Sequence, residues 1–287
     1  MSAFESDVMM RSYDPDSCLQ PRRHRPLPGH PKAWLAVSLS WAAGFVDATA
    51  YMALYHVYTS HMTGNTASFA GDLAECKWED AFHHGWVILP FLGGLLYSAA
   101  TTKAARRQGF HSSFSIALIT ELLLLSAFVA LGSHYLRDDH LAAPSSLIGY
   151  ALISMPAAAM GIQTVTVTRI NGLRVYTTYL TGSLSKCSEA VVDYLFWFRD
   201  RTRGRQLARL YLVLLVSLRQ RPMQHALLTA GLWLAFFAGA WCGVIGEHRF
   251  ALAALSAPMI IIAAAIVVDL VMPVAAADEP ETEQSAH

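Results

Sequence analysis

The sequence is short of charged residues. Only 15% of its 287 residues are Asp, Glu, Lys or Arg, and 54% are hydrophobic, whereas a soluble domain carries about 25% charged residues. The 21 basic and 21 acidic residues cancel, so no overall charge attracts nucleic acid or an acidic partner. This composition favours a protein whose main partner is the lipid bilayer.

Motifs of soluble enzymes and metal proteins are also missing. Cys18, Cys76, Cys187 and Cys242 form no CxxC pair, and their spacing indicates neither a zinc site nor a disulfide framework. The twelve histidines lack the tight spacing with Cys or carboxylate partners that is typical of zinc sites. No phosphate-binding loop or dinucleotide fingerprint is present, and no apolar segment holds a central histidine that could activate Ser183. We therefore expect no enzyme activity, no cofactor and no metal.

Six apolar segments are present, and each is about the 20 residues needed to cross a bilayer. None carries the polar stripe that a helix of a soluble bundle needs. The segments are Ala33–His56, His84–Thr102, Ser113–Leu131, Ser145–Thr168, His225–Gly246 and Phe250–Met272. They predict an all-α, polytopic membrane protein with six transmembrane helices.

Basic residues alternate between the connections of these segments. The N-terminal region and the second and fourth connections are rich in Lys and Arg, whereas the others contain one basic residue each: Lys77, Arg137 and Arg249. Because basic loops remain on the cytoplasmic side, we expect an inner-membrane protein with both termini in the cytoplasm. The short apolar stretch Ala208–Leu218 is flanked by arginines and is expected to lie in the interface, since its crossing would break the alternation.

A polar phrase occurs twice, each time after an apolar segment. YTSHMTGNTASFAG begins at Tyr58, and YTTYLTGSLSKCSE begins 118 positions later at Tyr176. The preceding segments also correspond, with one residue of slip, from Gly44 and Gly161 onward. Each half contains three spans, an odd number, so the second half must be inverted relative to the first, as in many secondary transporters.

This repeat divides the chain into two membrane units with flanking segments. Residues 1–31 are basic and residues 274–287 are acidic, and both are expected to be disordered. Residues 32–140 form the first repeat and residues 141–273 the second. The second repeat carries an Arg-rich amphipathic insert at about Arg199–Arg221 that is expected to bind anionic lipid.

Each phrase predicts a broken or re-entrant half-helix after the first span of its repeat. Such a break must be covered by protein or water, because lipid cannot satisfy its backbone groups. Thr63 or Asn65 is expected to cap the first half-helix. Two half-helix N-termini at one central site favour an anion or a polar small molecule. The alternative is that both phrases are only tight turns with helix caps.

Polar side chains within the spans complete the predicted site. Asp47 in the first span and Glu121 in the third are costly at this depth, which indicates function for Asp47 and either proton coupling or a buried ion pair for Glu121. We expect the helix face of Gly44 and Asp47 to meet that of Gly161 and Thr164, although close packing explains the glycines and threonines equally well. The predicted binding residues are Asp47, Thr63, Gly64, Asn65, Gln163, Thr164, Thr181, Gly182 and Ser183. The coupling candidates are Asp47, Glu121 and His61.

The two phrases and the residues before them resemble the signatures of a known family. AGFVDATAYMALYHVYTSHMTGNTASFAG and AAAMGIQTVTVTRINGLRVYTTYLTGSLSKCSEA are similar to those of the YoaK-like bacterial inner-membrane proteins, a domain of unknown function. The resemblance covers about Ala33–Met272 and implies a multi-pass membrane protein. It places on signature positions Gly44, Asp47, His61, Thr63, Gly64, Asn65, Gly161, Gln163, Thr181 and Gly182. It supplies no substrate.

Together these features predict a secondary transporter or permease for a small polar or anionic solute. Its site would lie between the two repeats, and Asp47 would bind or couple a proton or cation. The alternative is a non-transporting membrane scaffold or sensor that acts through Arg199–Arg221. A homo-oligomer is compatible with either function.

Overall fold

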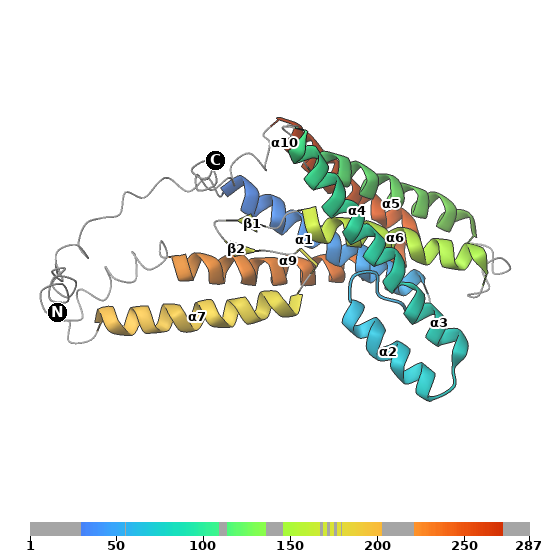
Figure 1. Cartoon of the computed structure of the whole chain (residues 1–287), viewed down its shortest axis with the longest axis horizontal. Helices are drawn as coiled ribbons and strands as arrows, with labels where there is room; N and C mark the ends of the chain where they lie inside the picture. The colour runs from blue at the N-terminus through green and yellow to red at the C-terminus, as the bar shows by residue number, and fades with distance from the viewer. Residues whose placement is uncertain are drawn as a thin grey trace, which may run out of the picture.

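The computed structural model describes residues 30–54, 56–108, 114–135, 146–166, 169–170, 173–174, 177–178, 180–202 and 221–271. Within them the chain is almost entirely helical (Figure 1). The helices are α1 (His30–Ala53), α2 (Met62–Ala74), α3 (Trp78–Trp86), α4 (Ile88–Arg107), α5 (Ser115–Tyr135), α6 (Leu147–Thr166), α7 (Leu180–Thr202), α9 (Arg221–Phe250), the 3-10 helix η1 (Ala251–Leu255) and α10 (Ser256–Val271). Two antiparallel two-residue strands, β1 (Arg169–Ile170) and β2 (Leu173–Arg174), lie between α6 and α7. The all-α prediction is confirmed.

Five segments are long and apolar enough to cross a membrane. They are Ala33–Ala53, Trp78–Ala105, Ser115–Tyr135, Leu147–Thr166 and Met223–Val271. The last contains 49 residues and includes most of α9, all of η1 and all of α10. Its helical length of roughly 74 Å at 1.5 Å per residue is more than twice the hydrocarbon thickness of about 30 Å. These segments fit a multi-pass membrane protein.

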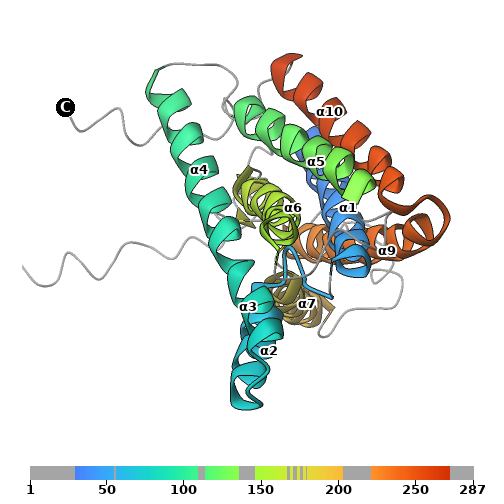
Figure 2. The same cartoon turned by 90° about the vertical axis from the view of Figure 1, so that its right-hand side faces the viewer.

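The first helix of each half, α1 or α6, packs against the other half of the chain. α1 packs along α9, and α6 packs along α4, so each of these helices lies against the long helix of the other half. α5 packs on α6, and α10 packs on α1 and α5. Figure 2 shows this arrangement with α6 and α1 in the middle, α4 on one side and α9 on the other. The centre of the molecule is therefore shared by both halves.

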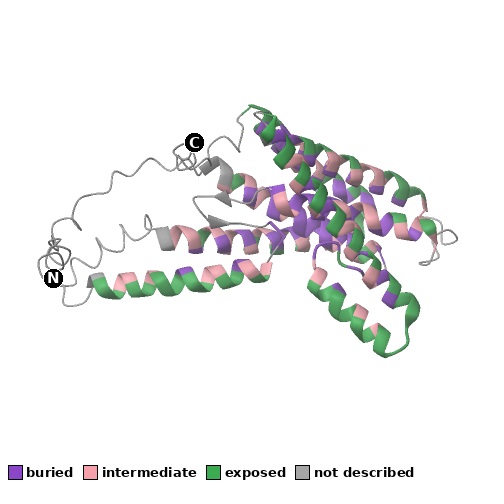
Figure 3. Cartoon of the chain, in the orientation of Figure 1, coloured by how far each residue is buried: buried purple, intermediate pink, exposed green. Residues whose placement is uncertain are grey.

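Buried residues are concentrated where these helices cross. Figure 3 shows the buried positions at the crossing of α1, α6 and α9, whereas α2 and α7 project from it with mostly exposed surfaces. α5 shows how the sequence creates one buried face. Leu118, Leu125 and Phe128 recur at helical spacing and are buried, whereas Leu123 on another face is 63% exposed, as expected for a helix between protein and lipid.

Glycines allow the paired helices to touch through their backbones. A Cβ atom added at Gly44 would overlap the carbonyl oxygen of Phe236 on α9, and one at Gly161 would overlap that of Phe91 on α4. The prediction that the faces of Gly44 and Gly161 meet each other is therefore wrong. Helical spacing identified both faces, but each packs against the long helix of the other half.

The long helices contribute glycines to the same contacts. A Cβ atom at Gly239 on α9 would overlap the carbonyl oxygen of Trp41 on α1, and one at Gly94 on α4 would overlap that of Ala158 on α6. Both interfaces thus have glycine on both sides. Small residues at helix contacts are typical of membrane proteins, where backbone packing replaces much of the hydrophobic driving force.

The second and fifth predicted spans are too short. α3 and α4 are nearly continuous over Trp78–Arg107, and α9 covers Arg221–Phe250. The extra turns have partners, since α2 packs on α3 and α7 packs on α9. The last helix is shorter than predicted and begins at Ser256, because the chain first passes through η1.

Several predictions concern residues outside the described ranges. The expected disorder of residues 1–29 and 274–287 and the interfacial position of Ala208–Leu218 belong to this group. Of the predicted insert, residues 199–202 form the end of α7, and Arg221 begins α9. These expectations stay predictions.

Candidate functional site

The helical structure is interrupted between α1 and α2, and the first polar phrase begins within this interruption. The interruption precedes the Thr-Gly-Asn triplet, which forms the first turn of α2. The prediction that Thr63 or Asn65 caps this helix is wrong, since the residue before it is His61, whose side chain makes no capping hydrogen bond. The Asn65 side chain instead accepts from the N–H of Tyr58 at 3.1 Å and donates to the Tyr58 carbonyl at 2.6 Å. It thereby satisfies backbone groups that the interruption leaves free.

Asp47 on α1 binds the residues of the interruption through its carboxylate. Its Oδ1 accepts hydrogen bonds from the N–H of Thr59 at 2.8 Å, the hydroxyl of Thr59 at 2.9 Å and the N–H of Ser60 at 2.7 Å. Its Oδ2 lies 2.7 Å from Nδ1 of His61. Asp47 is buried, so this carboxylate supplies the acceptor that lipid cannot offer to an interrupted helix.

The sequence predicted that an external anion could bind near the N-terminus of the half-helix, and the Asp47 carboxylate lies in such a position. Backbone N–H groups near a helix N-terminus attract negative charge, and here the chain supplies that charge itself. An anion placed beside Asp47 would meet a like charge at short range. The first phrase is therefore poorly suited to bind an anion directly.

His61 joins the buried carboxylate to the other half of the chain. Its side chain is 35% exposed, whereas that of Asp47 is 4% exposed. The imidazole packs edge-on against Phe236 of α9, with ring centroids 5.6 Å apart. The hydrogen bond to Asp47 raises the pKa of His61, although burial acts in the opposite direction. His61 is thus the accessible end of a pair that can take up and release a proton.

Neutral groups hold Thr177 and Thr178, the described residues at the start of the second phrase. Thr164 on α6, which aligns with Asp47, shares a hydrogen bond of 2.7 Å with the hydroxyl of Thr178. The carbonyl of Thr177 accepts a hydrogen bond of 3.1 Å from the Ser40 hydroxyl on α1. The second phrase therefore contacts both its own first helix and that of the other half.

The remaining predicted residues are not all brought to one place. The exposed or half-buried ones are Thr63, Gly64, Thr181 and Gly182. Gly64 has room for a Cβ, since its nearest neighbour would be the Tyr58 ring at 3.7 Å. Ser183 is buried in the first turn of α7. Gln163 is buried and donates to the Leu39 carbonyl at 2.7 Å, which joins α6 to α1.

Glu121 is a separate feature of α5. It is fully buried, and neither of its carboxyl oxygens has a hydrogen-bond partner in the described part of the chain. Burial of a carboxyl group without a partner is costly. Among the described residues, no hydrogen bond or ion pair joins Glu121 to the pair of Asp47 and His61.

Two residues at the centre were not predicted. Ser40 donates to the Leu232 carbonyl of α9 at 2.9 Å as well as to the second phrase, and Phe236 covers His61. Ser40 stands four positions before Gly44, so its place on the same helical face was a usable signal. Phe236 is one of many apolar residues in its span, and nothing in the sequence distinguishes it.

Comparison with known proteins places the chain in a family. Residues 35–268 match the family described as "Protein of unknown function (DUF1275)". The chain is 24% identical over 163 residues to the UPF0700 transmembrane protein YoaK of Bacillus subtilis (strain 168), which covers 57% of this chain and 68% of that protein. No solved structure matches the chain. The resemblance carried by the two phrases is confirmed, and the chain is a multi-pass membrane protein that belongs to the DUF1275 family of unknown function.

Proposed function

We propose that the protein is a proton-coupled secondary transporter for a small polar solute, rather than an enzyme. Its site lies between two inverted repeats of three spans each, in the inner membrane, with both termini in the cytoplasm. The observation that carries this proposal is the pair of Asp47 and His61, held at a helix interruption directly against α9 of the other half. Ionisable groups and interrupted helices at a repeat interface are typical of secondary transporters.

The glycine contacts support the inverted repeat. Gly44 and Gly161 stand at corresponding positions of the first and fourth spans. Phe91 and Phe236, which they meet, each stand three positions before the glycine of α4 or α9 that makes the return contact. The same backbone contact is thus made twice, with the roles of the halves exchanged. Two copies of one fold related by a pseudo-two-fold axis would have this property.

The direction of α1 and α9 supports six crossings. Ser40 bonds to the carbonyl of Leu232, and Thr49, further along α1, bonds to that of Gly243 at 3.3 Å. Residue numbers increase together, so the two helices are parallel. This agrees with α9 as the fifth crossing, and a crossing by Ala208–Leu218 would reverse it. The stretch itself lies outside the described residues, so its interfacial position stays a prediction.

The negative charge of Asp47 beside the first phrase limits the chemical class of solute that can bind there. Asp47 already binds the N–H groups of the interruption, so a neutral polar or cationic part of the solute suits this side. An anionic part would suit the second phrase, where Thr164 replaces the carboxylate. His61 is accessible enough to exchange its proton with such a solute or with water.

Asp47→Asn is expected to lower solute-coupled proton uptake at least about tenfold, the effect of roughly 1.4 kcal/mol. The amide keeps an acceptor for Thr59 and Ser60 but removes the charge that favours a proton on His61. Proteoliposomes that contain a pH-sensitive dye would be exposed to panels of amino acids, sugars, amines and carboxylates. The histidine NMR signals should also show a lower pKa for His61 in the variant.

Asp72→Asn is the matched control, because Asp72 and His84 join α2 and α3 through a contact of the same 2.7 Å length. This control should retain uptake. Full uptake by Asp47→Asn, or an equal loss in both variants, would contradict the assignment of the site. If no solute moved protons, the alternative would be favoured: a scaffold or sensor that acts through Arg199–Arg221.

A further inference from the structure

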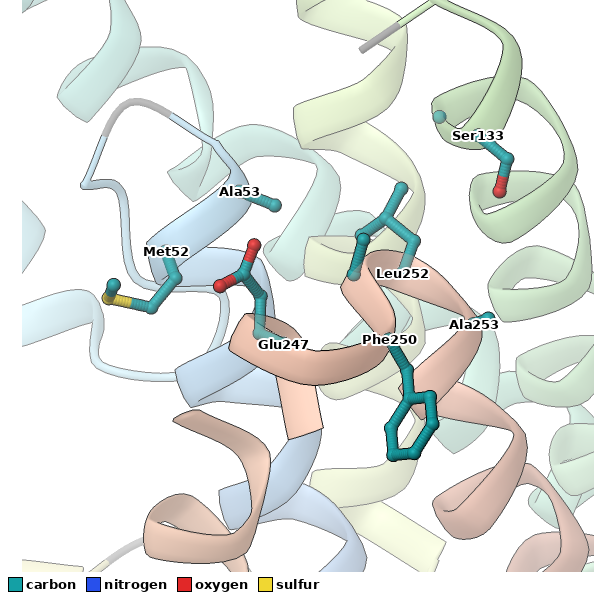
Figure 4. Close-up of a pocket in the computed structure, with 9 residues that line it drawn as sticks. Met52, Ala53, Ser133, Glu247, Phe250, Leu252 and Ala253 are labelled. Atoms are coloured by element: carbon teal, nitrogen blue, oxygen red, sulfur yellow. The ribbon is translucent and has the colours of Figure 1, made fainter. Parts of the chain in front are cut away.

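A cavity of about 410 Å³ lies at the ends of α1, α5 and α9 (Figure 4). Met52 and Ala53 of α1, Gly132 and Ser133 of α5, and Glu247 with residues 250–253 form its wall. None of the residues that hold Asp47 lines it. Its volume is in the range of small-molecule sites, roughly 300–1,000 Å³.

One negative charge faces this mainly apolar cavity. Glu247 is the ionisable residue among those that line it, and its side chain is 22% exposed. Figure 4 shows its carboxylate directed toward Met52 and Ala53. Nδ1 of His248 lies 3.6 Å from this carboxylate, which is within ion-pair range when the ring is protonated but too far for a hydrogen bond. The His248 side chain is itself 62% exposed, so a ligand ammonium group can compete with it for Glu247.

The backbone fixes one side of the cavity. Ala251 has a φ of 49°, in the left-handed region that residues with a side chain rarely adopt. This conformation turns the chain from α9 into η1. Strained residues of this kind persist where the surrounding fold holds them, and they are frequent at ligand sites. The turn at Ala251 thus places residues 250–253 along this side of the cavity.

We propose that this cavity binds a primary ammonium group, which has N–H donors for the Glu247 carboxylate, attached to an apolar body. Glu247 would pair with the ammonium, and Met52 and Leu252 would contact the hydrocarbon. An anion would meet the charge of Glu247, and calcium would require about six oxygen ligands. Free amines and the amino headgroup of a phospholipid share this chemistry. A headgroup could reach the cavity because the helix ends at Ala53 and Tyr135 coincide with the ends of apolar spans. The inference does not rest on transport.

The test measures the binding of benzylammonium by calorimetry, with the full-length protein in phosphatidylcholine nanodiscs. Benzyl alcohol, which has the ring without the charge, should bind at least tenfold more weakly. Glu247→Gln should weaken benzylammonium binding at least tenfold. Glu189→Gln removes a carboxylate from the exposed surface of α7 and should leave the affinity unchanged. Equal elution volumes would show that all variants are folded.

A second set of nanodiscs, which contains phosphatidylethanolamine, distinguishes the two sources of the ammonium group. A several-fold loss of apparent affinity in these discs would mean that the lipid headgroup competes for the cavity. An unchanged affinity would mean that the site prefers a free amine. The proposal would be overturned by undetectable binding to the wild type, by equal binding of the alcohol, or by full affinity in Glu247→Gln.

Discussion

Gly94→Leu is expected to prevent stable folding, whereas Gly93→Leu should leave the protein folded. A Cβ at Gly94 would overlap the carbonyl oxygen of Ala158 on α6, but one at Gly93 would have no neighbour within 4 Å. Overpacking usually costs about 1–3 kcal/mol, and the cost should exceed this range here because the obstacle is backbone that cannot rotate away. We expect it to approach the lower end of a typical stability of about 5–15 kcal/mol. Size-exclusion profiles and thermal unfolding in detergent would measure the difference.

The neighbouring pair is a strict control, because both variants add the same side chain to the same turn of α4. Gly161→Leu should fail in the same way, since its Cβ would overlap the carbonyl oxygen of Phe91 from the other side of the same interface. Normal folding of Gly94→Leu would show that α4 and α6 do not pack through their backbones.

Glu121→Leu is expected to raise thermal stability while it abolishes coupled uptake. Unpaired polar groups in a buried position cost about 1–3 kcal/mol, and leucine removes this cost at similar volume. The gain corresponds to a rise of about 2–4 °C in Tm for each kcal/mol in a protein of this size class. A stabilising change that removes function is typical of residues kept for activity.

Two other variants make this result specific to the buried carboxyl group. Glu121→Gln retains unpaired polar atoms and should give little gain in Tm. Glu79→Leu, at an exposed position of α3, should neither stabilise the protein nor affect uptake. A lower Tm for Glu121→Leu would mean that the carboxyl group has a stabilising partner and would remove the argument for a coupling role.

The sequence predicted the elements of this structure better than their partners. Hydropathy indicated the spans, and the cost of a buried charge singled out Asp47. His61 also attracted attention, but it lies 14 positions from Asp47, across the interruption. Their contact depends on how residues 56–61 fold back onto α1, which no periodicity encodes.

The helix contacts were missed for a related reason. The spacing of Gly44 and Asp47 shows which face of α1 is small and polar, but a helical face does not specify which helix it meets. The exchange of α1 and α6 between the halves is a property of the whole chain. The interruption was placed too late because Thr63 and Asn65 favour helix N-caps in general, whereas Asp47 supplies the acceptor here.

Site-specific thiol labelling tests the inverted repeat most directly. One variant would keep only Cys76, which is exposed after α2, and another would carry only Ser188→Cys, at an exposed position of α7. With a membrane-impermeant maleimide, we expect Cys76 to react in intact cells and position 188 to react only after the inner membrane is opened. Reaction of both from the same side would mean parallel halves, and a central site between two inverted repeats would be contradicted.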